Sequence, residues 1–350
     1  MMVSTKENNI EWITKAKGLA IIGVVAVHTV EVFDITGLIA EIADAGKYGV
    51  SLFFIISAYL TFMSFDKHPS RWTIKTYFHY LLHKLWRLAP VLYIAVFWHL
   101  AQYFFALERI PDLTDEMWKN AFYAVTFTNG FSPSYFNPWF NWYIGTLVVF
   151  LLIAPFIHKW INNAMRAVWF FLGSLILSKV SLYLMMYYGF NDGSYLYGWL
   201  PRQLPVISLG FVFYYLSKKE SQKAASLFAI IVSICLCLSI CTSFKIMETH
   251  VTAGLLLYLI TSLAFNRSNR WINWLKPLGE YSYGIYLFHG CLLLKTFRVV
   301  SNRIGIDKTS LGTFFIYFFL LFGISMMVSY LVNKYIEKPL FRFTKKKFGI

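Results

Sequence analysis

The chain has 350 residues, of which 58% are hydrophobic, 20% are aromatic and only 14% are charged. About a quarter of the residues of a soluble domain are charged, so this composition excludes an ordinary soluble protein and favours a polytopic membrane protein. In a soluble protein the net charge of +15 would indicate nucleic acid, but no basic run coincides with a nucleic-acid-binding motif. The positive-inside rule explains the surplus instead, so we expect membrane lipids and no nucleic acid around the chain.

Apolar runs predict ten transmembrane helices. They cover residues 14–33, 47–65, 88–106, 139–158, 167–187, 203–217, 224–243, 250–265, 281–299 and 312–333. The sixth and eighth runs are short and need flanking aromatic residues or a thinned bilayer to cross. With a cytoplasmic N-terminus, 22 Lys and Arg residues fall on the cytoplasmic side and 9 on the other. This asymmetry predicts an all-α protein with both termini in the cytoplasm. We expect one membrane domain over residues 1–350, with its core at 14–342 between a short polar N-terminal segment and a basic C-terminal tail.

The first predicted span carries ionisable residues on one face. Lys17 and His28 are eleven positions apart, which is about three helical turns and about 16 Å along the axis. Glu31 follows His28 by three residues, which brings the two side chains within reach. Ionisable side chains in a membrane are costly and generally face a cavity or a partner. His28 is therefore a candidate general base, and Glu31 either orients its ring or faces water at the interface. The run ends in VHTVEVFD, which is no signal-peptide cleavage site, so we expect it to stay as an anchor.

Two segments between the spans have a distinctive composition. Asp66–Ala89 is predicted to be a basic helix, which either lies on anionic headgroups or binds a polyanionic cytoplasmic ligand. Leu107–Asn137, on the opposite side, ends in a run rich in aromatic, Asn and Ser residues. Such a run is compatible with a sugar-binding site and equally with an aromatic belt at the membrane interface.

Other polar residues within spans are Lys179, His99 and His289, and each histidine is either functional or hydrogen-bonded to a neighbouring helix. The spacing of the four cysteines fits neither a zinc site nor a disulfide pattern, so they are interpreted as small packing residues. The sequence also contains no GxSxG or HExxH motif, so we expect neither a serine nucleophile of that kind nor a metal.

Several motifs occur in a fixed order along the chain. KGLAIIGVVAVH contains Lys17 and His28, GVSLFFIISAYL contains Ser57, and KLWRLAPVLY contains Lys84 and Arg87. The later motifs are WFNWYIGTLVVFLLIAP, LPRQLPVISLG, LGEYSYGIYLFH and IEKPLFR. In this order, over about residues 15–342, the chain resembles the acyltransferase 3 family of integral-membrane acyltransferases. Lys17 and Lys84 stand where that family has Arg. Lysine keeps the positive charge but cannot form the two parallel hydrogen bonds that a guanidinium makes.

The resemblance implies transfer of an acyl group, usually acetyl, from cytoplasmic acyl-CoA to a carbohydrate hydroxyl. The acceptor would be an O-antigen, capsule, exopolysaccharide or lipid-linked glycan, and the enzyme would lie in a bacterial cytoplasmic (inner) membrane. Acyl-CoA would be a substrate, with no bound cofactor. We expect His28 and Glu31 to be catalytic and Lys17, Lys84 and Arg87 to bind acyl-CoA. The expected cavity or acceptor residues are Ser57, Trp139, Trp142, Lys179, Arg202, Ser282, Tyr283, Tyr286 and His289.

The sequence leaves alternatives open. His28 could act as a base or carry the acyl group as a nucleophile. A transporter or flippase for an anionic or lipid-linked substrate also suits buried ionisable residues and a basic cytoplasmic face, although no inverted repeat is evident. A non-catalytic assembly partner is a third interpretation. A homo-oligomer is compatible with the sequence.

Overall fold

The computed structural model describes residues 3–67, 72–104, 114–131, 142–190, 193–218, 221–241, 246–265, 270–290 and 303–348. Within these ranges every regular element is a helix, which confirms the predicted fold class. Seven of the described helices are long and apolar enough to cross a membrane. They cover Glu11–Val30, Leu38–Lys67, Ile74–Ala101, Trp142–Trp160, Ala164–Tyr187, Gln222–Cys241 and Leu311–Thr344.

The other three predicted spans are not among these seven helices. Residues 203–217 lie in α9 (Leu200–Ser217), and residues 250–265 lie in α11 (Thr249–Phe265), a shorter apolar helix. The ninth predicted span begins with α13 (Ser282–Phe288), and its part from 291 to 299 lies outside the described residues. The count of ten spans and the orientation of the termini therefore stay predictions.

Residues 74–89 of the predicted basic segment and residues 88–104 of the predicted third span form one helix, α4 (Ile74–Phe104), with Pro90 inside it. Asp66 and Lys67 end α3 (Gly49–Lys67) instead, and residues 68–71 and 105–106 lie outside the described residues. Proline removes one backbone hydrogen bond and clashes with the preceding turn, so it weakens a helix. The helix nevertheless continues through Pro90. Lys84 and Arg87 are three residues apart on this helix and share a face directly before the proline.

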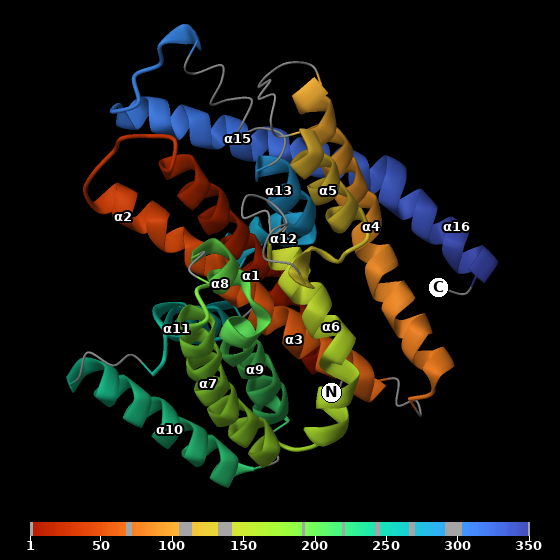
Figure 1. Cartoon of the computed structure of the whole chain (residues 1–350), viewed down its shortest axis with the longest axis vertical. Coiled ribbons are helices and arrows are strands. Elements are labelled where there is room, and N and C mark those ends of the chain that lie inside the picture. The colour runs from red at the N-terminus through yellow and green to blue at the C-terminus, as the bar shows by residue number, and fades with distance from the viewer. Residues whose placement is uncertain are drawn as a thin grey trace. The chain divides into compact units, whose positions relative to one another are not determined.

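The chain divides into two compact units. Unit 1 comprises Met1–Val50, Leu82–Trp142 and Thr261–Ile350, and unit 2 comprises Ser51–Leu81 and Tyr143–Ile260. In unit 1, α1 (Val3–Val30) contacts α2 (Leu38–Ala45), the short helix η1 (Gly46–Tyr48), α12 (Leu275–Glu280), α13 and α15 (Leu311–Val332). The α-helices among these elements are labelled in Figure 1.

Two glycines let α12 approach α1 very closely. A Cβ atom added to Gly279 would lie 1.8 Å from the carbonyl oxygen of Thr14, and one added to Gly18 would lie 2.3 Å from that of Leu275. No side chain fits at such distances. The two helices therefore meet backbone to backbone on either side of Lys17.

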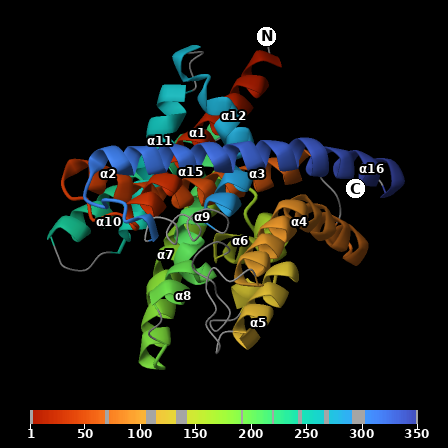
Figure 2. The ribbon, with the colours of Figure 1, turned by 90° about the horizontal axis from the view of Figure 1, so that it is seen from above.

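The C-terminal part of unit 1 is a continuous helical rod. α15 passes through a π-helical turn, η7 (Asn333–Glu337), into α16 (Lys338–Phe348). Figure 2 shows the rod along its whole length. Ser329 of α15 lies against Gly284 of α13, where an added Cβ would be 2.7 Å from the serine hydroxyl. The rod thus fixes α13, the helix that precedes His289.

In unit 2, α7 (Ala164–Tyr187) and α9 lie side by side in both views, and α10 (Gln222–Cys241) contacts α7. The side chain of Asn163 accepts a hydrogen bond from the backbone of Arg166 and so caps the start of α7. The core is aromatic, with the rings of Phe62 and Phe211 stacked 4.1 Å apart.

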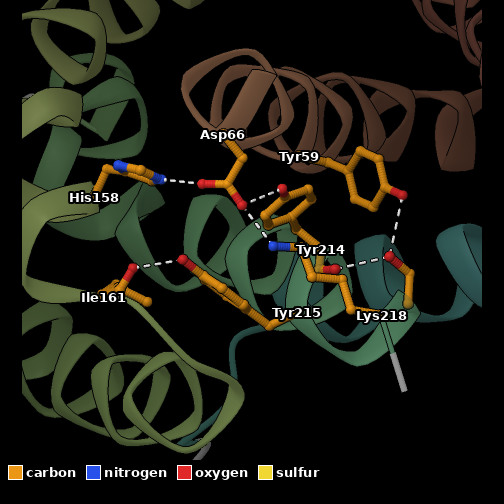
Figure 3. Close-up of polar contacts among 8 residues, drawn as sticks. Tyr59, Asp66, His158, Ile161, Tyr214, Tyr215 and Lys218 are labelled. Carbon is orange, nitrogen blue, oxygen red and sulfur yellow. Dashed lines mark hydrogen bonds and ion pairs between the residues drawn. The ribbon is translucent and has the colours of Figure 1, made fainter. Parts of the chain in front are cut away.

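A polar cluster ties three helix ends of unit 2 together (Figure 3). Asp66, at the end of α3 (Gly49–Lys67), accepts hydrogen bonds from Nε2 of His158 at 2.8 Å and from the hydroxyl of Tyr214 at 2.6 Å. The ammonium of Lys218 pairs with the same carboxylate and lies over the Tyr214 ring. His158 belongs to α6 (Trp142–Trp160), and Tyr214 belongs to α9. Because these partners are distant in sequence, the sequence analysis did not identify the cluster.

Candidate active site

His28 and Glu31 form a polar pair at the end of α1. Nδ1 of His28 lies 3.0 Å from Oε2 of Glu31, and the two side chains are 24% and 44% exposed. Because a carboxylate only accepts hydrogen bonds, Nδ1–H is the donor and Nε2 keeps its lone pair. His28 is in the last turn of α1, where free backbone carbonyls stabilise a developing positive charge. The predicted contact is thus present, and the geometry suits a base whose ring is oriented by a carboxylate.

His289 lies beside His28. Their ring centroids are 5.3 Å apart with an interplanar angle of 33°, and the His289 side chain is buried. Nδ1 of His289 donates to the carbonyl of Ile285 at 2.9 Å, which again leaves the lone pair on Nε2. That Nε2 atom has no hydrogen-bond partner among the described residues. The structure therefore brings together two imidazoles that the sequence analysis treated separately.

The residues expected to bind acyl-CoA also gather in unit 1. The ammonium groups of Lys17 and Lys84 each lie near enough to the guanidinium of Arg87 to repel it. Next to Arg87, the carbonyl of Leu88 accepts a hydrogen bond from the hydroxyl of Tyr283 at 2.8 Å, which holds α4 against α13. Like charges gathered in this way create a positive potential, which attracts a polyanion.

A further ion-pair group on α1 was missed by the sequence analysis. Glu11 pairs with Lys15 at 2.9 Å and with Lys276 at 2.8 Å. Lys15 is four residues from Glu11, so that pair could have been found from the spacing. Lys276 comes from α12, and no local pattern reveals it.

The other predicted residues of unit 1 have mixed surroundings. Ser282 donates to the carbonyl of Gly279 at 2.9 Å, in the turn between α12 and α13, so its hydroxyl is engaged structurally. The Tyr286 ring lies 6.0 Å from that of His289. Trp142 begins α6, and Trp139 lies outside the described residues.

The remaining predicted residues belong to unit 2. The hydroxyl of Ser57 lies 3.1 Å from that of Tyr143. Lys179 and Arg202 both pair with Glu248, a residue that the sequence analysis did not single out. In the described part of the chain no group of three or more His, Cys, Asp or Glu side chains is arranged to hold a metal ion.

Comparison with known proteins identifies the family. A family model described as an acyltransferase domain, Acyl_transf_3, matches residues 10–334, which is nearly the whole chain. The chain belongs to this family. No curated protein and no solved structure matches it. As a member of the acyltransferase family with several membrane-length helices, the protein is a multi-pass membrane acyltransferase. Both imidazoles and all three cations of the candidate site lie within the matched acyltransferase domain.

Proposed function

We propose that this acyltransferase moves an acyl group, expected to be acetyl, from cytoplasmic acyl-CoA to a hydroxyl of a cell-surface or lipid-linked polysaccharide. The observation that carries the proposal is the hydrogen bond between His28 and Glu31, with the buried ring of His289 beside it. Such an arrangement holds the lone pair of His28 Nε2 ready to accept a proton, as an alcohol requires before it attacks a thioester.

The proposed reaction is one acyl transfer. Nε2 of His28 takes the proton from the acceptor hydroxyl while the hydroxyl oxygen attacks the thioester carbonyl. The bond from carbonyl carbon to sulfur then breaks, and the departing thiolate takes the proton from the imidazolium. The products are an O-acyl ester and free CoA. Glu31 stabilises the transient positive charge through Nδ1–H.

His289 supports the same step. Its Nε2 lone pair is buried and without a hydrogen-bond partner among the described residues, next to the ring that becomes charged. A neutral imidazole in this place accepts a hydrogen bond from the substrate hydroxyl or from the protonated His28. We assign it a positioning role, because its own Nδ1 is engaged by a backbone carbonyl and no carboxylate contact is present in the described residues.

The donor is proposed to enter along α1. Lys17, Lys84 and Arg87 offer three cations to the phosphates of acyl-CoA. With a cytoplasmic N-terminus, Lys17 lies at the cytoplasmic side, and His28 lies about 16 Å deeper. The long, thin pantetheine arm suits that separation. We place the enzyme in the bacterial cytoplasmic membrane, with the acceptor on the outer side.

The test is acetyl transfer by the purified full chain in lipid vesicles, with acetyl-CoA as donor and lipid-linked glycan from the producing cells as acceptor. His28→Ala should abolish both the ester and the acceptor-dependent release of CoA, while thermal unfolding shows that the variant is folded. Added imidazole should restore part of the activity if the side chain acts as a base. Full activity in His28→Ala would refute the proposal, and glycan movement without thioester cleavage would favour a transporter or flippase.

A further inference from the structure

Unit 2 contains a second polar site around Glu248, which lies directly before α11. Arg202 of α9 reaches Oε2 of this carboxylate with both Nε, at 2.9 Å, and Nη2, at 2.8 Å. Lys179 of α7 donates to Oε1 at 3.2 Å, and Nδ1 of His250 lies 3.6 Å from Oε2. Three basic side chains from three helices thus converge on one carboxylate that is only 13% exposed.

The charges of this site do not balance. Lys179 and Arg202 carry two positive charges against the single negative charge of Glu248, and their side chains are only 26% and 23% exposed. Burial would raise the pKa of the Glu248 carboxyl, but Arg202, His250 and Lys179 together hold that pKa below its ordinary value. The carboxylate is therefore ionised at neutral pH, and one positive charge is left over. An uncompensated charge that is largely withdrawn from water is costly, and a bound anion relieves that cost.

His250 provides independent evidence for a ligand. Its side chain is 4% exposed, and its Nε2 has no hydrogen-bond partner among the described residues. A buried polar atom without a hydrogen-bond partner lowers stability, so such an atom generally has a reason to be there. The Tyr197 ring packs edge-on to that of His250 with centroids 5.6 Å apart, and the guanidinium of Arg202 lies over the same Tyr197 ring.

An aromatic surface continues from this site along α7. Lys179, Tyr183 and Tyr187 follow one another at four-residue spacing and so share a face. The Tyr183 and Tyr187 rings are stacked with an interplanar angle of 23°, and both side chains are largely exposed. In the proposed topology, α7 runs outward and α9 and α11 begin on the outer side. The polar site and the tyrosines then lie on the side where the acceptor is found.

We propose that Lys179 and Arg202 bind the anionic group of an acidic sugar, whose ring lies along Tyr183 and Tyr187. Because Nδ1 of His250 faces the Glu248 carboxylate, its Nε2 keeps a lone pair and accepts a hydrogen bond from a hydroxyl of the same sugar. The ligand chemistry is an oxyanion attached to a sugar, either the carboxylate of a uronic acid or a sugar phosphate. Arg202 and Lys179 supply charge-assisted hydrogen bonds, and Glu248 holds both side chains in place when the site is empty. The identity of this sugar as the acceptor rests on the proposed function, whereas the anion site itself does not.

The role of Glu248 predicts the direction in which its substitution should change the affinity for the ligand. As a resident anion, Glu248 competes with the ligand for the same donors, so Glu248→Gln should tighten the binding of an acidic sugar. If the group is only a structural ion-pair network, the same substitution should lower stability and create no affinity. Arg202→Gln and Lys179→Gln should each weaken binding by about tenfold or more, because each removes a charged hydrogen-bond donor.

The experiment is calorimetric titration of the full chain in lipid nanodiscs with glucuronate, glucose 1-phosphate and methyl glucoside. We expect binding of one or both anionic probes and none of methyl glucoside, and the two anionic arms distinguish a carboxylate from a phosphate. Asp66→Asn is the matched control, because it changes a carboxylate with three polar partners elsewhere in unit 2. It should leave the affinity for both probes unchanged.

Three results would overturn the inference: no preference for the anionic probes, weaker binding by Glu248→Gln, or unchanged binding by both Arg202→Gln and Lys179→Gln. Thermal unfolding of each variant shows whether lost binding reflects lost folding, and the gain expected for Glu248→Gln cannot arise from unfolding. His28→Ala separates this inference from the proposed function. It should keep the affinity for the acidic sugar while losing acyl transfer, so either property can fail alone.

Discussion

Replacing Glu31 by Gln should lower kcat only modestly, and the exposure of the pair sets the size of the effect. The side chain of Glu31 is 44% exposed and that of His28 is 24% exposed, so water screens their attraction. Screened ion pairs contribute about 0.2–1 kcal/mol. Because about 1.4 kcal/mol corresponds to a tenfold change in rate, Glu31→Gln should reduce kcat by at most about fivefold. His28→Gln removes the base itself and should reduce kcat by about a hundredfold to ten-thousandfold.

The assay is steady-state acetyl transfer by the purified chain at saturating acetyl-CoA, with both variants compared at one pH. The matched control is Glu41→Gln, which changes an exposed glutamate of α2 in the same unit and should leave kcat unchanged. The ratio of kcat between Glu31→Gln and His28→Gln tests the role assigned to Glu31. If Glu31→Gln lowers kcat as much as His28→Gln does, the carboxylate does more than orient a solvent-screened ring, and the reasoning is refuted.

Five other substitutions probe donor binding and packing. Arg87→Ala should raise the KM for acetyl-CoA about five- to tenfold, and the increase should be larger at low salt. Lys17→Arg should leave this KM unchanged, because it keeps the positive charge. An unchanged KM for acetyl-CoA in Arg87→Ala would favour contact of Arg87 with lipid headgroups. Gly279→Ala should destabilise the protein by about 1–3 kcal/mol in thermal unfolding, because its Cβ would lie 1.8 Å from a backbone oxygen of α1. Gly323→Ala, with open space around it, should be neutral or stabilising, and equal losses in both variants would contradict the steric argument. Asp66→Asn should cost about 1–2 kcal/mol through the weakened bonds of Figure 3, and an unchanged melting temperature would show that those bonds contribute nothing.

Local patterns in the sequence predicted much of the secondary structure. Hydropathy placed most of the long apolar helices, because a transmembrane helix needs a continuous apolar run of known length. Helical spacing predicted the contact of His28 with Glu31, since residues three apart share a face in any helix. The same local reasoning separated the basic segment from the third span, although α4 is one helix through Pro90. A proline weakens a helix without always ending it.

The sequence by itself thus determined the helical membrane class, the family motifs and the pairing of neighbours along one helix. Only the tertiary structure decided which distant side chains meet. His289 joins His28 because α13 packs against α1, and Glu248 gathers Lys179 and Arg202 because three helices converge on it. Contacts of this kind depend on close packing between whole helices, as the glycine contacts of α1 and α12 show, and neither composition nor periodicity encodes which faces will meet.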